Sequence, residues 1–276
     1  MNRSAAAALA PSRTPDAAMS LAAATARKPG NRAGLELWLV DLQRASNLLA
    51  AIEARSGVLS ADDIRRADTM ADAALRNERR AAYIALRLLL ERRLGEHVRG
   101  AAIERTPAGK PSLAGAEIAF SLAHTDGFAL VGLGDHGPLG VDIEVARRLA
   151  IAEPRRDLMR AAARGLAGAE LPAGLAPEPM LLAAWVRIEA VAKARGDGVA
   201  RLLTALGLIG ADRADAPSAA EVELRAGGIV QALGVTVTDI AGVTAAVAAP
   251  IGVPVSALVQ FPTDWTAWSA LAQLRT

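Results

Sequence analysis

The five residues from Gly140 to Glu144 constrain this chain more than any other stretch. They read GVDIE. In an extended strand, Val141 and Ile143 point to one face, whereas Asp142 and Glu144 point to the other. The apolar pair can enter a core, but two neighbouring carboxylates repel each other and need a counter-charge. The stretch therefore predicts either an exposed edge strand with a polar face or part of a site for a hard cation. Mg²⁺ typically takes one or two carboxylates together with substrate phosphates.

Composition excludes several classes of protein. The 276 residues, 52 % of them apolar, suffice for one large domain or two lobes. The sequence has no cysteine, which excludes disulfides, cysteine-ligated zinc and thiol catalysis, and fits a reducing cytoplasm. A net charge of +2 is too small for a polycation built to bind nucleic acid. No apolar stretch is long enough to cross a membrane, so we expect a cytoplasmic protein that binds neither nucleic acid nor membranes.

Lysine is scarce in this sequence. Of the 31 basic residues, only Lys28, Lys110 and Lys193 are lysines. A chain that uses arginine for generic positive charge retains lysine where the compact ammonium matters, for example at a phosphate. Lys28 lies in a low-complexity segment. Lys110 and Lys193 are therefore candidate site residues, with chance as the alternative explanation.

The first half of the chain alternates between predicted strands and helices. Residues 1–33 are rich in alanine and lack a period, which predicts a disordered tail. Residues 35–42 predict a strand, residues 58–95 predict helices, and residues 117–133 predict a hairpin. With the strand at 140–144, the hairpin would form a small antiparallel meander that brings His124 near Asp142.

The predicted helix over residues 77–94 is rich in arginine. Its polar positions and flanks carry Arg76, Arg79, Arg80, Arg87, Arg92 and Arg93. This set indicates either a solvated helix face or a basic surface for phosphate or an acidic partner.

The second half begins with a predicted helix that carries polar residues on an apolar stripe. The helix opens at Glu178 or Pro179 and ends near Arg195, before the Gly-Asp-Gly at 196–198. Its stripe contains Leu182, Trp185, Glu189 and Lys193. Glu189 and Lys193 are one turn apart, so they form either a simple ion pair or part of an inward-facing site.

The remainder predicts a second lobe that is similar to the first. Residues 221–248 alternate as four strands, with Gly227-Gly228 as a hairpin turn. We therefore predict an α+β fold of two similar lobes related by a pseudo-twofold axis, each a small antiparallel sheet packed with helices. The lobes span residues 34–146 and 180–276, and residues 147–179 form a linker or helical connection.

Four motifs in order resemble a known family. They are GKP at Gly109–Pro111, FSLAHT at Phe120–Thr125, GVDIE at Gly140–Glu144 and WVRIEAVAKARGDG at Trp185–Gly198. Together they resemble the 4′-phosphopantetheinyl transferases of the surfactin-synthetase-activating type, whose pattern is GKP, (F/N)xSH(S/T), G(V/I)D(I/V)E and WxxKEAxxKxxGxG. The resemblance covers about residues 35–250.

The resemblance implies a reaction and its metal site. Phosphopantetheine would be transferred from coenzyme A to a serine of an acyl or peptidyl carrier protein, leaving 3′,5′-adenosine bisphosphate. Asp142 and Glu144 would hold Mg²⁺ on the pyrophosphate, and Glu189 would share the metal or act as general base for the serine. The site would lie at the interface of the two lobes, and a monomer is the simplest expectation.

The resemblance also implies phosphate-binding residues. Lys193 would neutralise the transferring phosphate, and Lys110 and His124 would bind the phosphates of coenzyme A. Thr125 and Arg87 complete the predicted coenzyme-binding set. The arginine-rich helix is a candidate docking face for an acidic carrier protein.

Two departures from the family pattern leave alternatives open. Ala123 stands where the family has serine, and Ile188 stands where it has the lysine of its Lys-Glu pair. Thr125 or Ser121 is a candidate replacement for the missing hydroxyl. A degenerate relative that binds coenzyme A or a carrier protein without turnover is one alternative, and a Mg²⁺-dependent phosphohydrolase is another.

Overall fold

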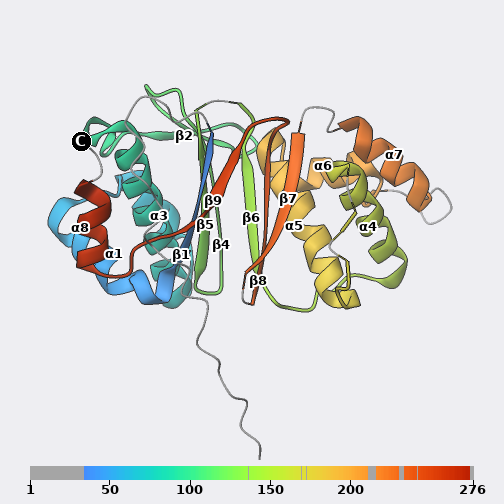
Figure 1. Ribbon diagram of the computed structural model, residues 1–276, viewed down its shortest axis with the longest axis horizontal. Helices are drawn as coiled ribbons and strands as arrows, with labels where there is room; N and C mark the ends of the chain where they lie inside the picture. The colour runs from blue at the N-terminus through green and yellow to red at the C-terminus, as the bar shows by residue number, and fades with distance from the viewer. Residues whose placement is uncertain are drawn as a thin grey trace, which may run out of the picture. The chain divides into compact units, whose positions relative to one another are not determined.

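Two β-sheets lie face to face, and helices cover the outer face of each (Figure 1). This computed structural model describes residues 34–135, 137–168, 170–171, 173–210, 216–229, 233–240 and 242–273, with only the backbone of 233–240. The predicted disordered tail, residues 1–33, lies outside the described residues. The α+β class predicted from the sequence is confirmed.

The first sheet has the strand order β4-β5-β1-β9. Its strands are β1 (Leu35–Asp41), β4 (Ala119–Thr125), β5 (Phe128–Gly134) and β9 (Val255–Gln260). The β4–β5 hairpin predicted from the sequence is confirmed, and β5 pairs antiparallel with β1. In contrast, β1 and β9 are parallel, so the prediction of a wholly antiparallel sheet is wrong here.

Helices from both ends of the chain cover the first sheet (Figure 1). They are α1 (Leu42–Ser56), α2 (Ala61–Asp68), α3 (Ala73–Leu94) and α8 (Trp265–Gln273). Ser60 caps the N-terminus of α2, because its hydroxyl accepts from the backbone N–H of Asp63 in a capping box. The helix α1 was not predicted. A short 3₁₀ turn, η2 (Glu96–Val98), leads to the hairpin of β2 (Ile103–Arg105) and β3 (Pro111–Leu113). The loop of this hairpin carries Lys110.

The second sheet is antiparallel, with the order β6-β8-β7. Its strands are β6 (Gly140–Val145), β7 (Leu233–Ile240) and β8 (Val243–Pro250), and the helices beside it are α4 (Glu153–Ala167), α5 (Pro177–Arg195), α6 (Val199–Leu206) and α7 (Ala219–Ile229). The predicted helix ending before Gly196 is confirmed as α5, and Gly196 adopts a left-handed φ of 74°. None of the helices in the described ranges is long and apolar enough to span a bilayer.

Three of the four apolar clusters among the described residues lie between these layers. One lies under α1 and α3, one lies between β8 and the helices α4 and α5, and one lies between the two sheets. The core between the sheets contains Val141 and Ile143, so the predicted inward face of the GVDIE strand is confirmed. The opposite face of β6 packs against α5.

Close backbone contact brings β6 and α5 together. A Cβ atom on Gly140 would lie 2.0 Å from the carbonyl oxygen of Ala190 and 2.4 Å from the backbone nitrogen of Ala194. Only glycine fits at this distance. As a result, the strand that carries Asp142 lies directly against the helix that carries Lys193.

Three sequence predictions about the topology are corrected. β6 does not continue a meander with β4 and β5, because its ladder partner is β8. It still meets β4, since the backbone N–H of Val141 donates to Ser121 Oγ at 3.1 Å. Residues 147–179 contain α4, which packs into the core of the second sheet and is more than a connection. The C-terminal residues 255–273 return to the first sheet as β9 and α8.

Residues 219–229 form helix α7, where two strands and a glycine hairpin were predicted. Val222 and Ala226 are four residues apart and both buried, which is the spacing of one helix face. This face packs on α4, where a Cβ atom on Gly165 would lie 2.2 Å from the carbonyl oxygen of Glu223. Helix packing therefore outweighs the turn preference of Gly227-Gly228. The last two predicted strands are confirmed as β7 and β8.

Candidate functional site

A cleft of about 350 Å³ is lined by residues of α2, α3, the β2–β3 hairpin and β4, and by residues of α5 and the turn that follows it. Five of its lining residues are arginine or lysine, and one is a glutamate. Its polar lining residues are Arg66, Arg79, Tyr83, Arg105, Lys110, Ser121, His124, Glu189 and Lys193. This excess of positive charge favours an anionic ligand.

Asp142 joins the cleft through a buried ion pair with Lys193. The Nζ of Lys193 donates to Asp142 Oδ1 at 2.6 Å. The other oxygen, Oδ2, is buried and has no hydrogen-bond partner among the described residues. Burial raises the pKa of Asp142 to about 6, against the attraction of Lys193, and the charges of Glu189 and Glu144 add to the rise. Asp142 does not itself line the cleft; it lies behind Lys193, which does, with one buried carboxylate oxygen left without a partner among the described residues.

Glu144, two residues along β6, is bound by a cation of its own. Arg147 donates from Nε to Oε2 at 2.9 Å and from Nη2 to Oε1 at 2.7 Å. The hydroxyl of Thr125, on β4, lies 3.4 Å from Oε2 and donates to it. Glu144 is thus held in place from two sides.

Glu189 is half-buried in the cleft wall on α5. Burial raises the pKa of its carboxyl above the ordinary value, Lys193 opposes this, and the charge of Glu144 adds to it. A carboxylate with a raised pKa is a better proton acceptor at neutral pH. The three predicted carboxylates therefore influence one another electrostatically, although they come from two elements.

His124 faces α3 rather than the second sheet. Its Nδ1 lies 3.8 Å from Glu78 Oε1. Burial lowers the pKa of His124, and the positive charges of Arg79 and Lys193 lower it further, whereas Glu78 opposes them. The imidazole is therefore biased toward its neutral form, which can both donate and accept a hydrogen bond.

Lys110 reaches from the loop 106–111 to the end of α5. Its Nζ donates to the carbonyl oxygen of Ala194, in the last turn of that helix, where the negative end of the helix dipole attracts a cation. Burial lowers the pKa of Lys110. A Cβ on Gly196 would lie 2.5 Å from Cδ of Lys110, so the glycine makes room for this lysine.

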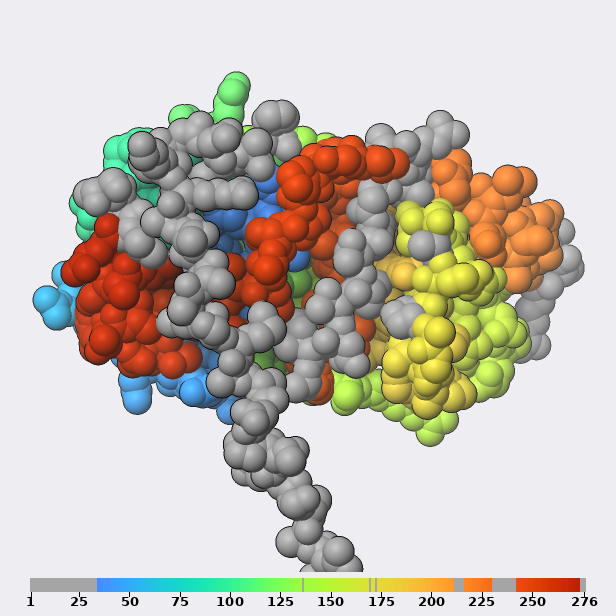
Figure 2. Space-filling view, viewed as in Figure 1, coloured from blue at the N-terminus to red at the C-terminus, as the bar shows by residue number. Residues whose placement is uncertain are grey.

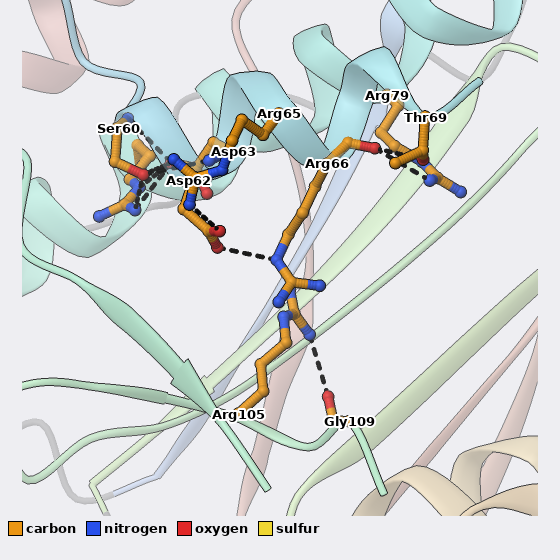
Figure 3. Close-up of polar contacts among 10 residues, drawn as sticks. Ser60, Asp62, Asp63, Arg65, Arg66, Thr69, Arg79, Arg105 and Gly109 are labelled. Atoms are coloured by element: carbon orange, nitrogen blue, oxygen red, sulfur yellow. Dashed lines mark hydrogen bonds and ion pairs between the residues drawn. The ribbon is translucent and has the colours of Figure 1, made fainter. Parts of the chain in front are cut away.

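A group of arginines that sequence analysis did not assign to the site lines the opposite side of the cleft. Figure 3 shows the guanidinium groups of Arg66 and Arg105 next to each other, with Arg66 held by Asp62 and Arg105 by the carbonyl of Gly109. Burial lowers the pKa of Arg105, and the charge of Arg66 lowers it further. Two adjacent cations favour a multiply charged anion between or beside them. The position of Arg105, directly before the loop that carries Lys110, is the signal that was available in the sequence.

Two of the predicted coenzyme-binding residues do not line the cleft: Thr125, which contacts Glu144, and Arg87. The side chain of Arg87 is 2 % exposed, and it binds Asp63 Oδ2 at 2.7 and 2.9 Å and the carbonyl oxygen of Ala101 at 2.5 Å. It also donates to Ser60 Oγ at 3.2 Å. The prediction for Arg87 is corrected, because this guanidinium joins α2, α3 and the loop before β2, and does not line the cleft.

The other arginines of α3 are also engaged within the chain. Arg80 pairs with Asp68, Arg93 pairs with Glu36 and Asp135, and Arg92 lies over the ring of Trp38. Arg79 is the arginine of α3 that lines the cleft. These contacts favour a mainly structural role for the arginine-rich helix.

The two departures from the family pattern lie in apolar cores. Ala123 is buried in the core between the sheets, on the face of β4 opposite to His124. Ile188 is fully buried in the core of the second sheet. Ser121, a candidate replacement for the missing hydroxyl, accepts from the backbone of Val141.

The carboxylate oxygens near Asp142 suit a hard cation that takes most of its ligands from water and substrate. The buried Oδ2 of Asp142 has no partner among the described residues, and Glu144 and Glu189 are electrostatically coupled to it. However, across the described ranges no group of three or more His, Cys, Asp or Glu side chains is arranged to hold a metal ion by itself. Magnesium does not require such a cage, because it usually takes one or two carboxylates and fills the remaining positions with water and phosphate.

Comparisons with known proteins do not assign a family to this chain. No family model matches the chain, and no curated protein matches it.

Proposed function

We propose that this protein transfers 4′-phosphopantetheine from coenzyme A to a serine of an acyl or peptidyl carrier protein. The observation that carries the proposal is the buried Asp142–Lys193 pair at the wall of a cationic cleft, with one carboxylate oxygen left without a partner. Coenzyme A carries a pyrophosphate and a 3′-phosphate, and such a ligand suits a cleft lined by five arginines and lysines.

The reaction requires charge neutralisation and a proton acceptor. The serine oxygen attacks the phosphorus that carries the pantetheine arm, the bond from that phosphorus to the bridging oxygen breaks, and 3′,5′-adenosine bisphosphate leaves. In this proposal Glu189 accepts the serine proton, since burial raises the pKa of its carboxyl toward neutrality. Lys193 lies beside Asp142 and neutralises the phosphate that is transferred.

The remaining cations bind and orient the coenzyme. Lys110 and His124 contact its phosphates, and the adjacent guanidiniums of Arg66 and Arg105 supply a second cluster of charge. Asp142, Glu144 and Glu189 are the residues that would hold Mg²⁺. When bound there, the cation would withdraw charge from the pyrophosphate oxygens.

The proposed site lies where two halves of the chain meet. The cleft is lined by α2, α3, the β2–β3 hairpin and β4 from one half, and by α5 from the other. We propose that these halves are pseudo-twofold lobes with the active site at their interface, and that the protein acts as a monomer in the cytoplasm. The core positions of Ala123 and Ile188 support an active enzyme over a degenerate relative, because substitutions there remove no polar group from the cleft lining.

A mass measurement on the carrier protein tests the proposal. The protein is incubated with coenzyme A, Mg²⁺ and an apo acyl or peptidyl carrier protein, and the carrier is then weighed. We expect a gain of one phosphopantetheine per carrier that requires Mg²⁺. Coenzyme A binding without any gain would indicate the non-catalytic relative, and phosphate release without carrier modification would indicate a phosphohydrolase.

A further inference from the structure

Each of the two carboxylates of β6 is already bound by a cation from the chain. Lys193 binds Asp142 through one hydrogen bond of 2.6 Å, and Arg147 binds both oxygens of Glu144 at 2.7 and 2.9 Å. A guanidinium in this position carries a full positive charge next to the carboxylate. It therefore repels any divalent cation that approaches the same oxygens.

The two internal cations differ in how easily they can leave. Lys193 and Asp142 lie on α5 and β6, whose backbones are in direct contact at Gly140. Arg147 lies in residues 146–152, outside any helix or strand, and its side chain is 45 % exposed. The guanidinium of Arg147 can therefore turn into solvent without disturbing a core.

A neutral partner remains at Glu144 when Arg147 leaves. The hydroxyl of Thr125 lies 3.4 Å from Oε2, on the neighbouring strand β4. Because Glu144 is 15 % exposed and keeps this contact, its position does not depend on Arg147 alone.

We infer that Arg147 is an internal latch on the metal site, whose guanidinium occupies Glu144 in the free protein and swings away when a divalent cation binds. The inference rests on the proposed function, which is what requires the cation. The latch keeps the neighbouring carboxylates from repelling one another in the metal-free protein. It also lowers the apparent metal affinity, because only the molecules in which Arg147 has left Glu144 can bind the cation.

The test measures the affinity of the protein for Mn²⁺ alone, with free Mn²⁺ detected by its electron paramagnetic resonance signal. We expect Arg147→Ala to bind Mn²⁺ about fivefold tighter than the wild-type protein, the effect of removing one partly exposed ion pair. Arg148→Ala is the matched control, since it removes the same charge from the next residue along the chain. The side chain of Arg148 is 81 % exposed and lies 3.8 Å from Glu178. An Arg147→Ala affinity equal to or below that of the wild type overturns the latch, as does an equal gain in Arg148→Ala.

A second pair of variants separates the latch from a general charge effect. In the Glu144→Gln background the carboxylate that Arg147 covers is absent, so adding Arg147→Ala should give no gain in Mn²⁺ affinity. A gain that persists in this background overturns the inference.

The carrier-mass assay on the same preparations distinguishes this inference from the proposed function. Carrier modification without a difference in Mn²⁺ affinity overturns the latch and leaves the transferase standing. Tighter Mn²⁺ binding by Arg147→Ala without carrier modification by the wild-type protein supports the latch and overturns the transferase.

Discussion

Two of the buried carboxylate–cation pairs in the described part of the chain differ in how many of their hydrogen-bond partners are present. Between α2 and α3, Asp63 Oδ2 accepts from the backbone N–H and the hydroxyl of Ser60 and binds Arg87 through two nitrogens. At the cleft, Asp142 binds Lys193 through one oxygen, and its other oxygen has no partner within the described part of the chain. Both carboxylates are buried, but only the first is surrounded by donors.

The difference indicates a structural role for the first pair and a ligand-binding role for the second. A buried carboxylate that accepts several hydrogen bonds and an ion pair is held within the fold, because these contacts offset its desolvation. A buried carboxylate with a vacant oxygen costs stability and keeps the capacity to bind a ligand. The second pair lies beside the cleft, because Lys193 lines it, which agrees with this interpretation. Figure 3 shows the first carboxylate, Asp63, close to Ser60.

The largest expected effect is on activity. Asp142→Asn should lower kcat/KM for carrier modification about a thousandfold or more, since a ligand of the proposed metal contributes several kcal/mol to the transition state. The mirror variant, Asp63→Asn, should leave kcat/KM within about threefold of the wild type at a temperature where the variant remains folded. Full activity of Asp142→Asn in the carrier-mass assay would contradict the site assignment.

The second effect is on stability, and here the variant between α2 and α3 should lose more than the variant at the cleft. Arg87→Ala should lower the free energy of unfolding by about 3–5 kcal/mol, because it leaves Asp63 charged and buried without its partner. Urea unfolding followed by circular dichroism measures this change. Arg105→Ala is the control, because the guanidinium of this half-buried arginine donates to the carbonyl oxygen of Gly109 and has no buried carboxylate to leave unpaired. It should change the free energy of unfolding by less than about 1 kcal/mol. Similar losses of unfolding free energy for the two variants would contradict the interpretation that the Asp63–Arg87 pair mainly stabilises the fold.

The third effect is a dependence of stability on pH. Because burial raises the pKa of Asp142 to about 6, the folded state binds a proton that the unfolded state has already released. The contribution of Asp142 to stability is therefore fully present below the unfolded pKa and is lost as the pH rises through about 6. We expect the free energy of unfolding of Asp142→Asn to exceed that of the wild type by about 1–3 kcal/mol at pH 7, and the difference to shrink at pH 4. Urea unfolding across this range is the measurement, and a constant difference would contradict the raised pKa.

A smaller effect is expected on ligand affinity at the arginine side of the cleft. Arg105→Ala should weaken coenzyme A binding about tenfold, which is the usual cost of losing a charged hydrogen bond. Isothermal titration calorimetry with coenzyme A in the absence of carrier measures it. Arg87→Ala is the comparison, since its guanidinium contacts Asp63 and not the cleft, and an equal loss of affinity in the two folded variants would place Arg87 back among the binding residues.

The smallest effect concerns the departure from the family pattern at Ala123. Ala123→Ser introduces the serine of the family that the sequence resembles, but the hydroxyl would enter the core between the sheets and cost about 1–2 kcal/mol of stability. Coenzyme A affinity should stay within about twofold of the wild type. A clear gain in affinity from this variant would show that position 123 contributes to the cleft.

Sequence patterns predicted the local elements well because their causes are local. The alternation in β6, the hairpin of β4 and β5, and the length of α5 before Gly196 all follow from neighbouring residues. The pairing of β6 with β8 and the return of β9 to β1 join segments more than a hundred residues apart, and no periodicity within a strand encodes its partner. Helix α7 was missed because its packing on α4 outweighs its glycines.

For the site, the sequence by itself singled out the candidate residues. It placed Asp142 and Glu144 on one face of a strand, put Glu189 and Lys193 one helical turn apart, and singled out Lys110 and Lys193 by their scarcity. Only the tertiary structure decided which charged groups have hydrogen-bond or ion-pair partners. The missing side chain of Gly140 lets α5 approach β6, so Lys193 meets one oxygen of Asp142 and the other stays without a partner among the described residues. Arg87 lost its predicted role for the same reason, because α2 brings Asp63 against it and uses its charge within the fold. Hydrogen bonds extend over about 3 Å, and such distances between remote segments are set by packing rather than by sequence spacing.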